Sequence, residues 1–387
     1  MIGKILEESR RNTVSRRIDE ICSISRGRVM SKDYIRENAG NYPVFSSQTE
    51  HNGELGRISK YDYEGEYLTW TTDGANAGTV FYRNGRFSVT NVCGILKVIV
   101  DDVMPKYLYY ALSITTPSYV NGGMGNPKLM SNVMSRIVVH VPPLEVQREI
   151  VRVLDKFTFL TAELTAELTA RKKQYEYYRD QLLSNWIDIQ EISILDMLSQ
   201  PITDGPHETP AFVQNGIPFL SAEAIVDSRL DFKHVRGYIT KEYDLACAKK
   251  YKPQKGDVYM CKSGSTTGKV AINDTDEDFN IWSPLAAMRV NQNHSAKYLY
   301  YLLQSKSVQE QVQMQASHGS QPNLSMRKLE QFKVRVPSKD VQERIVSVLD
   351  NFERICNDLN IGLPAEIDAR QKQYEYYRDK LLSFKEK

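Results

Sequence analysis

The chain has 387 residues, of which 41% are hydrophobic and 25% charged, and its formal net charge is +2. Such a composition is typical of a soluble globular protein, and the length favours two or three domains. The charge balance by itself does not indicate nucleic-acid binding. No apolar run approaches the ~18 residues of a membrane span, and the N-terminus lacks the apolar core of a signal peptide, so we expect a cytoplasmic protein.

The first globular part, about residues 18–140, consists of short strand-like runs such as EYLTWTTDG and GTVFYRNGRFSVT, followed by a short helix, PKYLYYALS. His140 lies within the run IVVHV and is expected to be a strand residue. Two polar loops stand out, SSQTEHNG (46–53) and TTDGANAG (71–78). These side chains are ordinary turn residues, but they also carry the donors and acceptors that contact bases and phosphates.

A single long helix is predicted from about Leu144 to Trp186, because the segment contains neither glycine nor proline after its start and is rich in helix formers. It includes the tandem TAELTAEL (161–168). The apolar residues recur at helical spacing and predict a stripe that packs against a partner helix. Its members are Val146, Ile150, Val153, Leu154, Phe157, Leu160, Leu164, Leu168, Tyr175, Tyr178 and Leu182.

The second globular part, about residues 192–335, repeats the strand-rich character of the first. It contains the loops TDGPHETP (203–210) and CKSGSTTGK (261–269) and one predicted helix, AKYLYYLLQSKSVQEQVQ. The segment GSTTGKV (264–270) is one residue short of a phosphate-binding loop, and valine stands where serine or threonine would bind Mg²⁺. It also continues as a strand, GKVAIND, so we do not expect nucleotide binding.

The C-terminal part is again helical, but IGLP (361–364) interrupts it. Gly362 should end one helix, and Pro364 should lie in the first turn of the next. Apolar residues Ile345, Val348, Leu349 and Phe352, and then Tyr374, Tyr377 and Leu381, repeat the stripe of the first long helix.

An internal duplication explains these similarities. RKKQYEYYRDQLLS (171–184) matches RQKQYEYYRDKLLS (370–383), VPPLEVQREIVRVLDKF (141–157) matches VPSKDVQERIVSVLDNF (336–352), and GNPKL (125–129) answers SQPNL (320–324). The blocks follow the same order at offsets of 191 to 199 residues. Two copies of one module are therefore predicted, each a variable globular part followed by a similar helical part.

We therefore predict an α+β fold with two globular domains joined by two long helical spacers, which pack as an antiparallel coiled coil with pseudo-two-fold symmetry. The predicted parts are residues 1–142, 143–190, 191–336 and 337–387. Tyr175, Tyr178 and Leu182 are expected to pack between the helices and to face Tyr374, Tyr377 and Leu381.

Catalytic and metal-binding signatures are absent from the sequence. It has no G-x-S-x-G or H-E-x-x-H motif, no glycine-rich cofactor loop after a strand, and no Asn-Pro-Pro-aromatic tetrapeptide of the kind used by amino-methyltransferases. The five cysteines and six histidines do not cluster at ligand spacing. We expect a non-catalytic chain that holds no metal.

The chain resembles the specificity subunits of type I restriction–modification systems over essentially its whole length. The resemblance rests on the blocks YPVFSSQ (42–48), DGPHETP (204–210), GIPFL (216–220), PLEVQREIVRVLD, TAELTAEL, LPAEI (363–367) and the doubled QYEYYRD. The resemblance implies two target recognition domains, 1–142 and 191–336, that each read one half of a bipartite double-stranded DNA site. It also implies that the helical spacers set the gap between the halves and dock two methyltransferase (modification) subunits. Restriction subunits would join through the modification subunits. S-adenosylmethionine, ATP and Mg²⁺ would bind to those partners and not to this chain.

Within this family the polar loops become candidate DNA contacts. The candidates in the first half are Ser47, Gln48, Thr49, Thr71, Thr72 and Asn76, and those in the second half are His207, Lys262, Ser263, Ser265, Thr266, Thr267 and Lys269. Two other classes of protein were weighed. A stand-alone DNA-binding regulator would not need two similar helical modules, and a fused restriction–methylation enzyme would need a cofactor loop and catalytic tetrapeptide within the chain.

Overall fold

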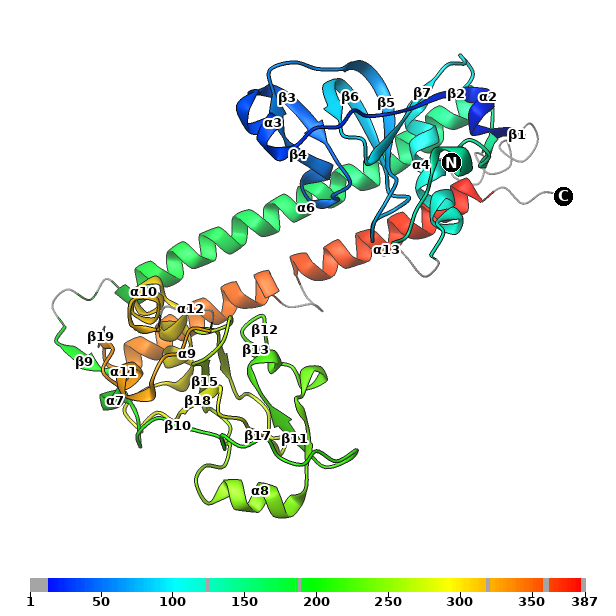
Figure 1. The fold of residues 1–387 in the computed structure, drawn as a ribbon. Coiled ribbons are helices and arrows are strands. Elements are labelled where there is room, and N and C mark those ends of the chain that lie inside the picture. The colour runs from blue at the N-terminus through cyan, green and yellow to red at the C-terminus, as the bar shows by residue number, and fades with distance from the viewer. Residues whose placement is uncertain are drawn as a thin grey trace. The chain divides into compact units, whose positions relative to one another are not determined.

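The computed structural model describes residues 13–122, 126–184, 186, 189–317, 321–357 and 362–383. It contains two compact units. Unit 1 comprises Met1–Glu163 and Ile367–Lys387, and unit 2 comprises Leu164–Glu366. Each unit therefore combines one globular part with helical segments from both halves of the chain (Figure 1). The predicted division at residues 142, 190 and 336 follows sequence blocks and not packing, and it stays a prediction.

The globular part of unit 1 has the following elements in chain order: β1 (Val14–Arg17), α2 (Ile18–Ile21), β2 (Cys22–Arg26), α3 (Lys32–Glu37), β3 (Ala39–Phe45), the 3₁₀ turn η1 (Glu50–Gly53), β4 (Glu54–Ile58), β5 (Tyr63–Thr71), β6 (Val80–Val89), β7 (Cys93–Val98), α4 (Pro105–Thr115), η2 (Thr116–Tyr119), α5 (Ser131–Met134) and β8 (Val138–Val141). Six strands form a sheet in the order β2-β7-β5-β6-β3-β4, and β1 pairs with β8. His140 lies in β8, as predicted.

The core of this part packs helix α4 onto the sheet. Leu108 and Leu112 on α4 belong to the same buried cluster as Leu96 and Trp70 on the strands. Trp70 is fully buried, and its indole Nε1 donates a hydrogen bond to the Leu129 carbonyl oxygen at 2.9 Å. Its ring lies against Gly94 on β7, where a Cβ atom would come within 2.1 Å of the indole. Only glycine fits at this position, because no L side chain can approach an aromatic ring so closely.

The globular part of unit 2 has the elements β9 (Glu191–Ser193), α7 (Ile194–Met197), β10 (Thr203–Asp204), β11 (Ile217–Leu220), η3 (Ala222–Ala224), β12 (Ile225–Val226), β13 (Arg229–Leu230), η4 (Phe232–His234), β14 (Gly237–Ile239), α8 (Lys241–Ala248), β15 (Val258–Cys261), β16 (Val270–Ile272), β17 (Asn280–Ile281), β18 (Leu285–Met288), α9 (Ala296–Gln304), α10 (Lys306–Gln315), α11 (Met326–Glu330) and β19 (Lys333–Arg335). Its larger sheet has the order β10-β18-β15-β16-β13-β12. The run β10-β18-β15-β16 repeats the run β2-β7-β5-β6 of unit 1, and β9 pairs with β19 as β1 pairs with β8. The predicted duplication and the α+β class are thus confirmed.

Helix α6 (Leu144–Ser184) is a single helix of 41 residues, as predicted, and it ends two residues before the expected Trp186. The C-terminal helical part is divided into α12 (Lys339–Asn357) and α13 (Leu363–Leu382). Gly362 has a φ of +100°, and Pro364 is the second residue of α13. The predicted interruption is confirmed, since only glycine readily adopts that φ and proline is tolerated in a first turn.

The helices pack in antiparallel pairs within each unit (Figure 1). In unit 1 the first part of α6 lies against α13, with the rings of Phe157 and Tyr377 stacked at 5.4 Å. In unit 2 the last part of α6 lies against α12, with the rings of Tyr178 and Phe352 stacked at 6.0 Å. The second stack is the duplicate of the first, because Phe352 corresponds to Phe157 and Tyr377 to Tyr178.

All six residues predicted to pack between helices do so, but not with each other. In unit 2, Tyr175 and Leu182 belong to the core or pack against it, and Tyr178, which is 42% exposed, stacks on Phe352 beside them. In unit 1, Leu381 is buried in the core, and Tyr374 and Tyr377 pack against it. The expectation that the two QYEYYRD copies face one another is wrong. In an antiparallel pair the end of one helix meets the beginning of the other, so each QYEYYRD segment meets the block that begins the other helical part.

The predicted helix over residues 296–313 is also wrong in one respect, because it is two helices, α9 and α10. Ser305 between them has an extended backbone (φ −63°, ψ 150°). Its hydroxyl donates a hydrogen bond to the Leu302 carbonyl oxygen at 2.6 Å, which satisfies an acceptor at the end of α9. Serine competes with helix continuation in this way, since its side chain can bond to nearby backbone groups.

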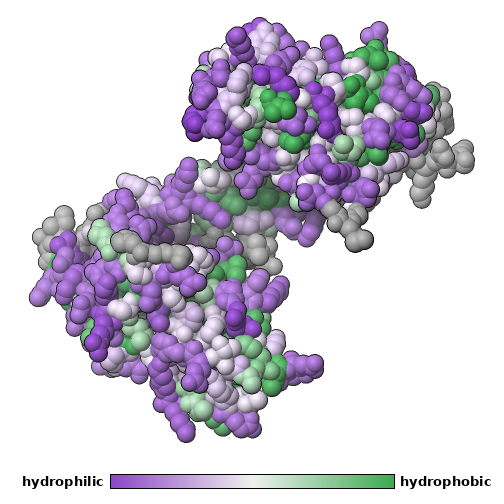
Figure 2. Space-filling view, in the orientation of Figure 1, coloured by the Kyte–Doolittle hydropathy of each residue, from purple (hydrophilic) through white to green (hydrophobic). Residues whose placement is uncertain are grey.

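The visible surface is mainly hydrophilic, with hydrophobic side chains in scattered patches (Figure 2). Among the described residues, no helix combines the length and apolar character needed to span a membrane.

Candidate functional site

A loop with the same backbone frame occurs once in each unit. Residues 72–79 connect β5 to β6, and residues 262–269 connect β15 to β16. In the first loop, the amide of Gly74 donates to the Pro127 carbonyl oxygen at 3.0 Å. In the second loop, the amide of Gly264 donates to the Pro322 carbonyl oxygen at 2.9 Å. Both prolines lie in the matching blocks GNPKL and SQPNL, which explains why those short blocks recur.

Two glycines in each loop make the frame possible. Gly74 and Gly78 have φ values of +95° and +85°, and Gly264 and Gly268 have +91° and +96°. Left-handed φ values at two positions four residues apart require glycine, because other L residues are strained there. The loops therefore present their intervening residues in the same conformation.

The side chains carried on this frame differ. Ala75, Asn76 and Thr79 in the first loop correspond to Ser265, Thr266 and Lys269 in the second. Asn76, Ser265 and Lys269 are exposed. A frame kept constant beneath changed exposed side chains is suited to reading different ligands with one geometry.

In unit 1 the structure brings the two predicted loops together. The Asn76 amide nitrogen lies 3.3 Å from the Thr49 hydroxyl, so the segments around residues 49 and 76 form one surface. Gln48 donates from its amide to the Glu54 carbonyl oxygen and thereby orders its own loop. Ser47 is half-buried beside it.

Two of the predicted candidates in unit 1 are interior residues. Thr71 and Thr72 are both 0% exposed, and the Thr72 hydroxyl donates to the Val92 carbonyl oxygen at 2.9 Å. The Thr72 side chain holds the base of the loop, and neither threonine reaches the surface of the loop. Sequence could not distinguish them from exposed threonines, because the strand β5 continues into the loop without a change of residue type.

A buried cation beneath this surface was not expected from the sequence. Arg83 on β6 is 4% exposed, its guanidinium lies 3.6 Å from the centre of the Phe45 ring, and its Nε donates to the Thr69 hydroxyl at 3.2 Å. Burial lowers the pKa of Arg83 to about 10. Nη1 has no hydrogen-bond partner among the described residues. Phe45 ends β3 directly before the 46–53 loop, so Arg83 supports that loop from below.

In unit 2 two of the predicted candidates, His207 and Lys262, lie close to one buried carboxylate. Asp204 is 1% exposed, and its Oδ2 lies 3.2 Å from Nε2 of His207 and 3.3 Å from Nζ of Lys262. Its Oδ1 forms an ion pair with Lys250. Oδ2 accepts no hydrogen bond of good geometry from the described residues, so His207 and Lys262 interact with it mainly by charge. One carboxylate thus faces two lysines and a histidine, which leaves an excess of positive charge.

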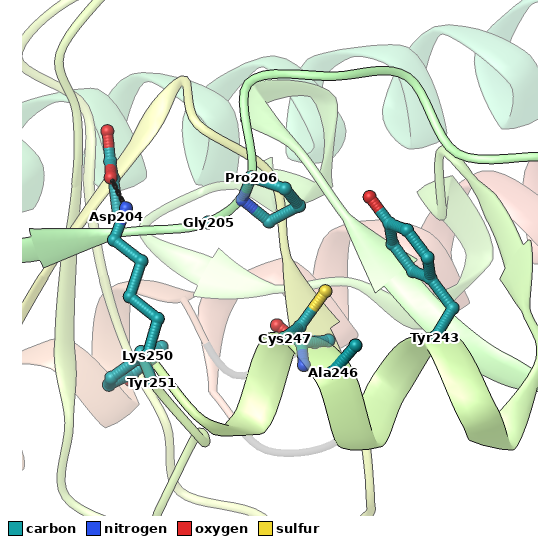
Figure 3. Close-up of a pocket in the computed structure, with 9 residues that line it drawn as sticks. Asp204, Gly205, Pro206, Tyr243, Ala246, Cys247, Lys250 and Tyr251 are labelled. Atoms are coloured by element: carbon teal, nitrogen blue, oxygen red, sulfur yellow. Dashed lines mark hydrogen bonds and ion pairs between the residues drawn. The ribbon is translucent and has the colours of Figure 1, made fainter.

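A cavity of about 250 Å³ lies beside this cluster, between the segment Asp204–Pro206 and helix α8. Figure 3 shows Cys247 and Tyr243 on α8 and Pro206 on the opposite wall, with the Lys250 side chain reaching Asp204. Lys250 and Tyr243 were missed by sequence reasoning. The available signal was Asp204 at the start of the polar loop TDGPHETP, because a carboxylate next to a strand implies a cation from elsewhere in the fold.

The remaining candidates of unit 2 have different roles in the loop. The Thr267 hydroxyl donates to the Gly264 carbonyl oxygen at 2.8 Å, and the Thr266 hydroxyl lies 3.2 Å from the sulfur of Cys261. The Ser263 carbonyl oxygen accepts from the same thiol. These three residues therefore build the loop. Ser265 and Lys269 are the ones that remain exposed for an external ligand.

Among the residues that the structure describes, no three His, Cys, Asp or Glu side chains come together as metal ligands would. The chemistry available at both loops is hydrogen bonding by amides and hydroxyls and attraction of anions by lysine and histidine.

Comparisons with known proteins agree with the duplicated architecture. The family model described as "Type I restriction modification DNA specificity domain" matches residues 11–171 and again residues 209–369. A protein of Mycoplasma pneumoniae named as a type I specificity subunit is 33% identical over 377 residues, which cover 95% of this chain and 97% of that protein.

Two solved structures have a similar fold. The crystal structure of a type I restriction–modification S subunit from M. genitalium matches with a TM-score of 0.57 and 14% identity, covering 97% of both chains. A chain from a structure of complex assembly and conformational transition in a type I R–M system matches with a TM-score of 0.60 and 15% identity, covering 96% of this chain and 98% of that one.

Proposed function

The chain belongs to the family of type I restriction–modification specificity subunits, and from this membership we propose that each globular part reads one half of a bipartite site in double-stranded DNA. The observation that supports the proposal is the repeated loop. Its backbone is the same in both units, while its exposed residues are Ala75 and Asn76 in the first loop and Ser265 and Lys269 in the second. One frame with two side-chain sets would read two different half-sites.

The contacts in the first half-site come from the surface joined by Thr49 and Asn76. Amide and hydroxyl groups of this kind donate to and accept from base edges, and an asparagine can pair with adenine in two hydrogen bonds. Gln48 and Ser47 lie beside them as further candidates. Thr71 and Thr72 are not proposed as contacts, because both are buried.

The contacts in the second half-site come from His207, Ser265 and Lys269, with Lys262 contributing charge from beneath. Lys269 is exposed and suits a phosphate contact. Lys262 is largely buried and fixed by Asp204, so it adds positive potential without moving. Positive charge held in this way attracts the phosphates of the DNA backbone.

The helical parts set the gap between the half-sites and dock two modification subunits. Tyr177 on α6 and Tyr376 on α13 are duplicates of each other and are 61% and 58% exposed. Large exposed rings at equivalent places in both units fit two identical partners, since tyrosine is enriched in protein interfaces. Restriction subunits would be recruited through the modification subunits.

In this scheme the chain itself performs no catalysis and holds no cofactor. S-adenosylmethionine would belong to the modification subunits, and ATP and Mg²⁺ to the partner subunits. The four parts 1–142, 143–190, 191–336 and 337–387 are proposed as two recognition domains and two conserved spacers.

Two manipulations test the proposal by methylome sequencing of cells that carry the complete system. Deletion of residues 165–168 removes one TAEL copy, which shortens α6 by about 6 Å and turns it by about 40° beyond a full turn. We expect a shorter gap between unchanged half-sites. Replacing residues 191–336 with another recognition domain should change one half-site only. An unchanged gap in the first case, or two changed half-sites in the second, would contradict the proposal.

A further inference from the structure

Each globular part is fastened to its own long helix by the same two sets of polar contacts. The first set surrounds a buried glutamine near the start of the helix. Gln147 on α6 accepts from the Met104 amide and donates to the Pro142 carbonyl oxygen, both at 2.8 Å. Gln342 on α12 accepts from the Ser295 amide at 2.9 Å and donates to the Pro337 carbonyl oxygen at 2.8 Å. Both glutamines are 0% exposed.

The second set is an aspartate that holds a lysine and a tyrosine. In unit 1, Asp155 on α6 accepts from Lys106 Nζ at 2.8 Å and from the Tyr110 hydroxyl at 2.7 Å. Both donors lie on α4. We call this arrangement the unit 1 latch.

The unit 2 latch is its duplicate. Asp350 on α12 accepts from Lys297 Nζ at 2.6 Å and from the Tyr301 hydroxyl at 2.7 Å, and both donors lie on α9. The distances agree within 0.2 Å although the surrounding strands and loops have diverged.

The spacing between the two sets matters. Gln147 and Asp155 are eight residues apart, and so are Gln342 and Asp350, which separates the two attachment points by about 12 Å along each helix. One attachment point would leave the globular part free to tilt about it. Two points fix the tilt, because they define a line on the helix surface.

The apolar contacts between these elements do not supply the same restraint. Tyr107, Tyr110 and Ala111 pack with Val146 and Ile150 in one cluster, but hydrophobic contact is non-directional and tolerates small rotations. Hydrogen bonds to an ionised carboxylate are directional and stronger than neutral ones. The latch therefore restrains the angle beyond what the apolar cluster does, because its hydrogen bonds join specific atoms of the two elements.

We infer that Asp155 and Asp350 are positioning residues for spacer selectivity: by fixing the tilt of each recognition part on its helix, they restrict the complex to one separation between half-sites. The inference rests on the proposed function, since it assigns the cause of one property of that function. It predicts that loosening a latch widens the range of accepted gaps while the half-sites stay the same.

The two latches are unequal, which provides an internal test. In unit 2 the Tyr301 hydroxyl also lies 2.7 Å from Oε2 of Glu353, and the Tyr300 hydroxyl lies 2.8 Å from Oε1 of the same residue. The residue that corresponds to Glu353 in unit 1 is Thr158. Tyr301 thus keeps a carboxylate partner when Asp350 is lost, whereas Tyr110 has no second carboxylate among the residues described in its surroundings.

The experiment uses the full chain in complex with its modification subunits, and duplexes that carry the wild-type half-sites with the gap unchanged or altered by one base pair in either direction. The measured quantity is the ratio of methylation rates on the unchanged and altered duplexes. We expect Asp155→Ala to lower this ratio about tenfold, equivalent to about 1.4 kcal/mol of lost discrimination. Asp350→Ala should lower it less than about threefold, and the double variant with Glu353→Ala should reach the effect of Asp155→Ala.

Glu149→Ala is the matched control. Glu149 lies on the same helix as Asp155 and, among the residues that the structure describes, its ion pair is with Arg152 along the helix at 2.8 Å, so the ratio should not change. Should Asp155→Ala fail to fold, Tyr110→Phe decides the matter, because it keeps the ring and removes only the hydroxyl that Asp155 holds.

The outcomes separate the inference from the proposed function. The inference is overturned if Asp155→Ala keeps the wild-type ratio. If Asp155→Ala does not fold, a wild-type ratio in Tyr110→Phe overturns it instead. An effect of Asp350→Ala as large as that of Asp155→Ala also overturns it. A latch that only stabilised the fold would slow methylation of the unchanged and altered duplexes alike. The ratio would then stay unchanged, and this result also counts against the inference. A wild-type complex that shows no preference for one gap would instead refute the proposed function.

Discussion

Replacing Asp204 with asparagine should destabilise unit 2, because Asp204 is the shared counter-charge for His207, Lys250 and Lys262. The side chain of Asp204 is 1% exposed, and that of Lys262 is 12% exposed. Asparagine keeps the shape of the residue and removes only its charge. After the replacement Lys262 would be left largely buried without an opposite charge.

The size of the effect follows from how much each cation can escape into water. His207 and Lys250 have side chains that are 72% and 53% exposed, so both can turn to solvent and their loss contributes little. Lys262 cannot. Breaking a buried ion pair by removing one partner costs about 3–5 kcal/mol, and we expect the lower end, about 3 kcal/mol, because the cavity beside the cluster lets some water in. For a unit of this size that corresponds to a fall in Tm of roughly 6–12 °C.

Thermal unfolding of the full chain, followed by tryptophan fluorescence, measures this directly. Asp276→Asn is the control, because Asp276 is 82% exposed and pairs with Lys255 at the surface, and its Tm should stay within about 2 °C of wild type. In Asp204→Asn combined with Lys262→Met, both buried charges are removed, so most of the lost stability should return. If Asp204→Asn unfolds at the wild-type temperature, the buried carboxylate does not compensate Lys262 and the account of this cluster is wrong.

Three further outcomes are expected. Gly94→Ala should lower the free energy of unfolding of unit 1 by about 1–3 kcal/mol, because its Cβ would overlap the Trp70 ring; denaturant unfolding checks it. Gly362→Ala should cost about 1 kcal/mol in the same assay, since its φ is +100°. Burial and nearby Lys339 hold the pKa of His294 below its usual 6.5, and its Nδ1 faces the amide of Gln342. The unfolded chain therefore binds the proton more readily, so stability should fall as pH drops below 6.5, and His294→Val should flatten that dependence in a Tm–pH series.

Sequence reasoning predicted the helical framework well because its signals are local or repeated. The length of α6 follows from a run of helix formers, and the break before α13 follows from Gly362 and Pro364. The recurrence of GNPKL and SQPNL was visible in the sequence, but their hydrogen bonds to the two loops were not. The division at Ser305 was missed, because a single serine gives too weak a signal against a long helical pattern.

The candidate contacts were less predictable, since exposure is a property of the folded chain. Thr72 and Thr49 are the same residue type in similar polar surroundings, yet one is buried and the other exposed. Arg83 and Lys250 lie in no recognisable sequence motif. Each became recognisable only when the fold placed it beneath a loop or beside Asp204.

The sequence by itself determined the duplication, the family and the order of parts, because near-identical blocks such as QYEYYRD at 174–180 and 373–379 are visible without a fold. The tertiary structure decided what those blocks touch. In an antiparallel pair the end of one helix lies beside the beginning of the other. Each QYEYYRD segment therefore stacks a tyrosine on the phenylalanine that closes the first block of the other helical part, Tyr178 on Phe352 and Tyr377 on Phe157. Antiparallel packing was predicted from the sequence, but which segments meet depends on how the connections place the helices along one another, and no single stretch of sequence records that.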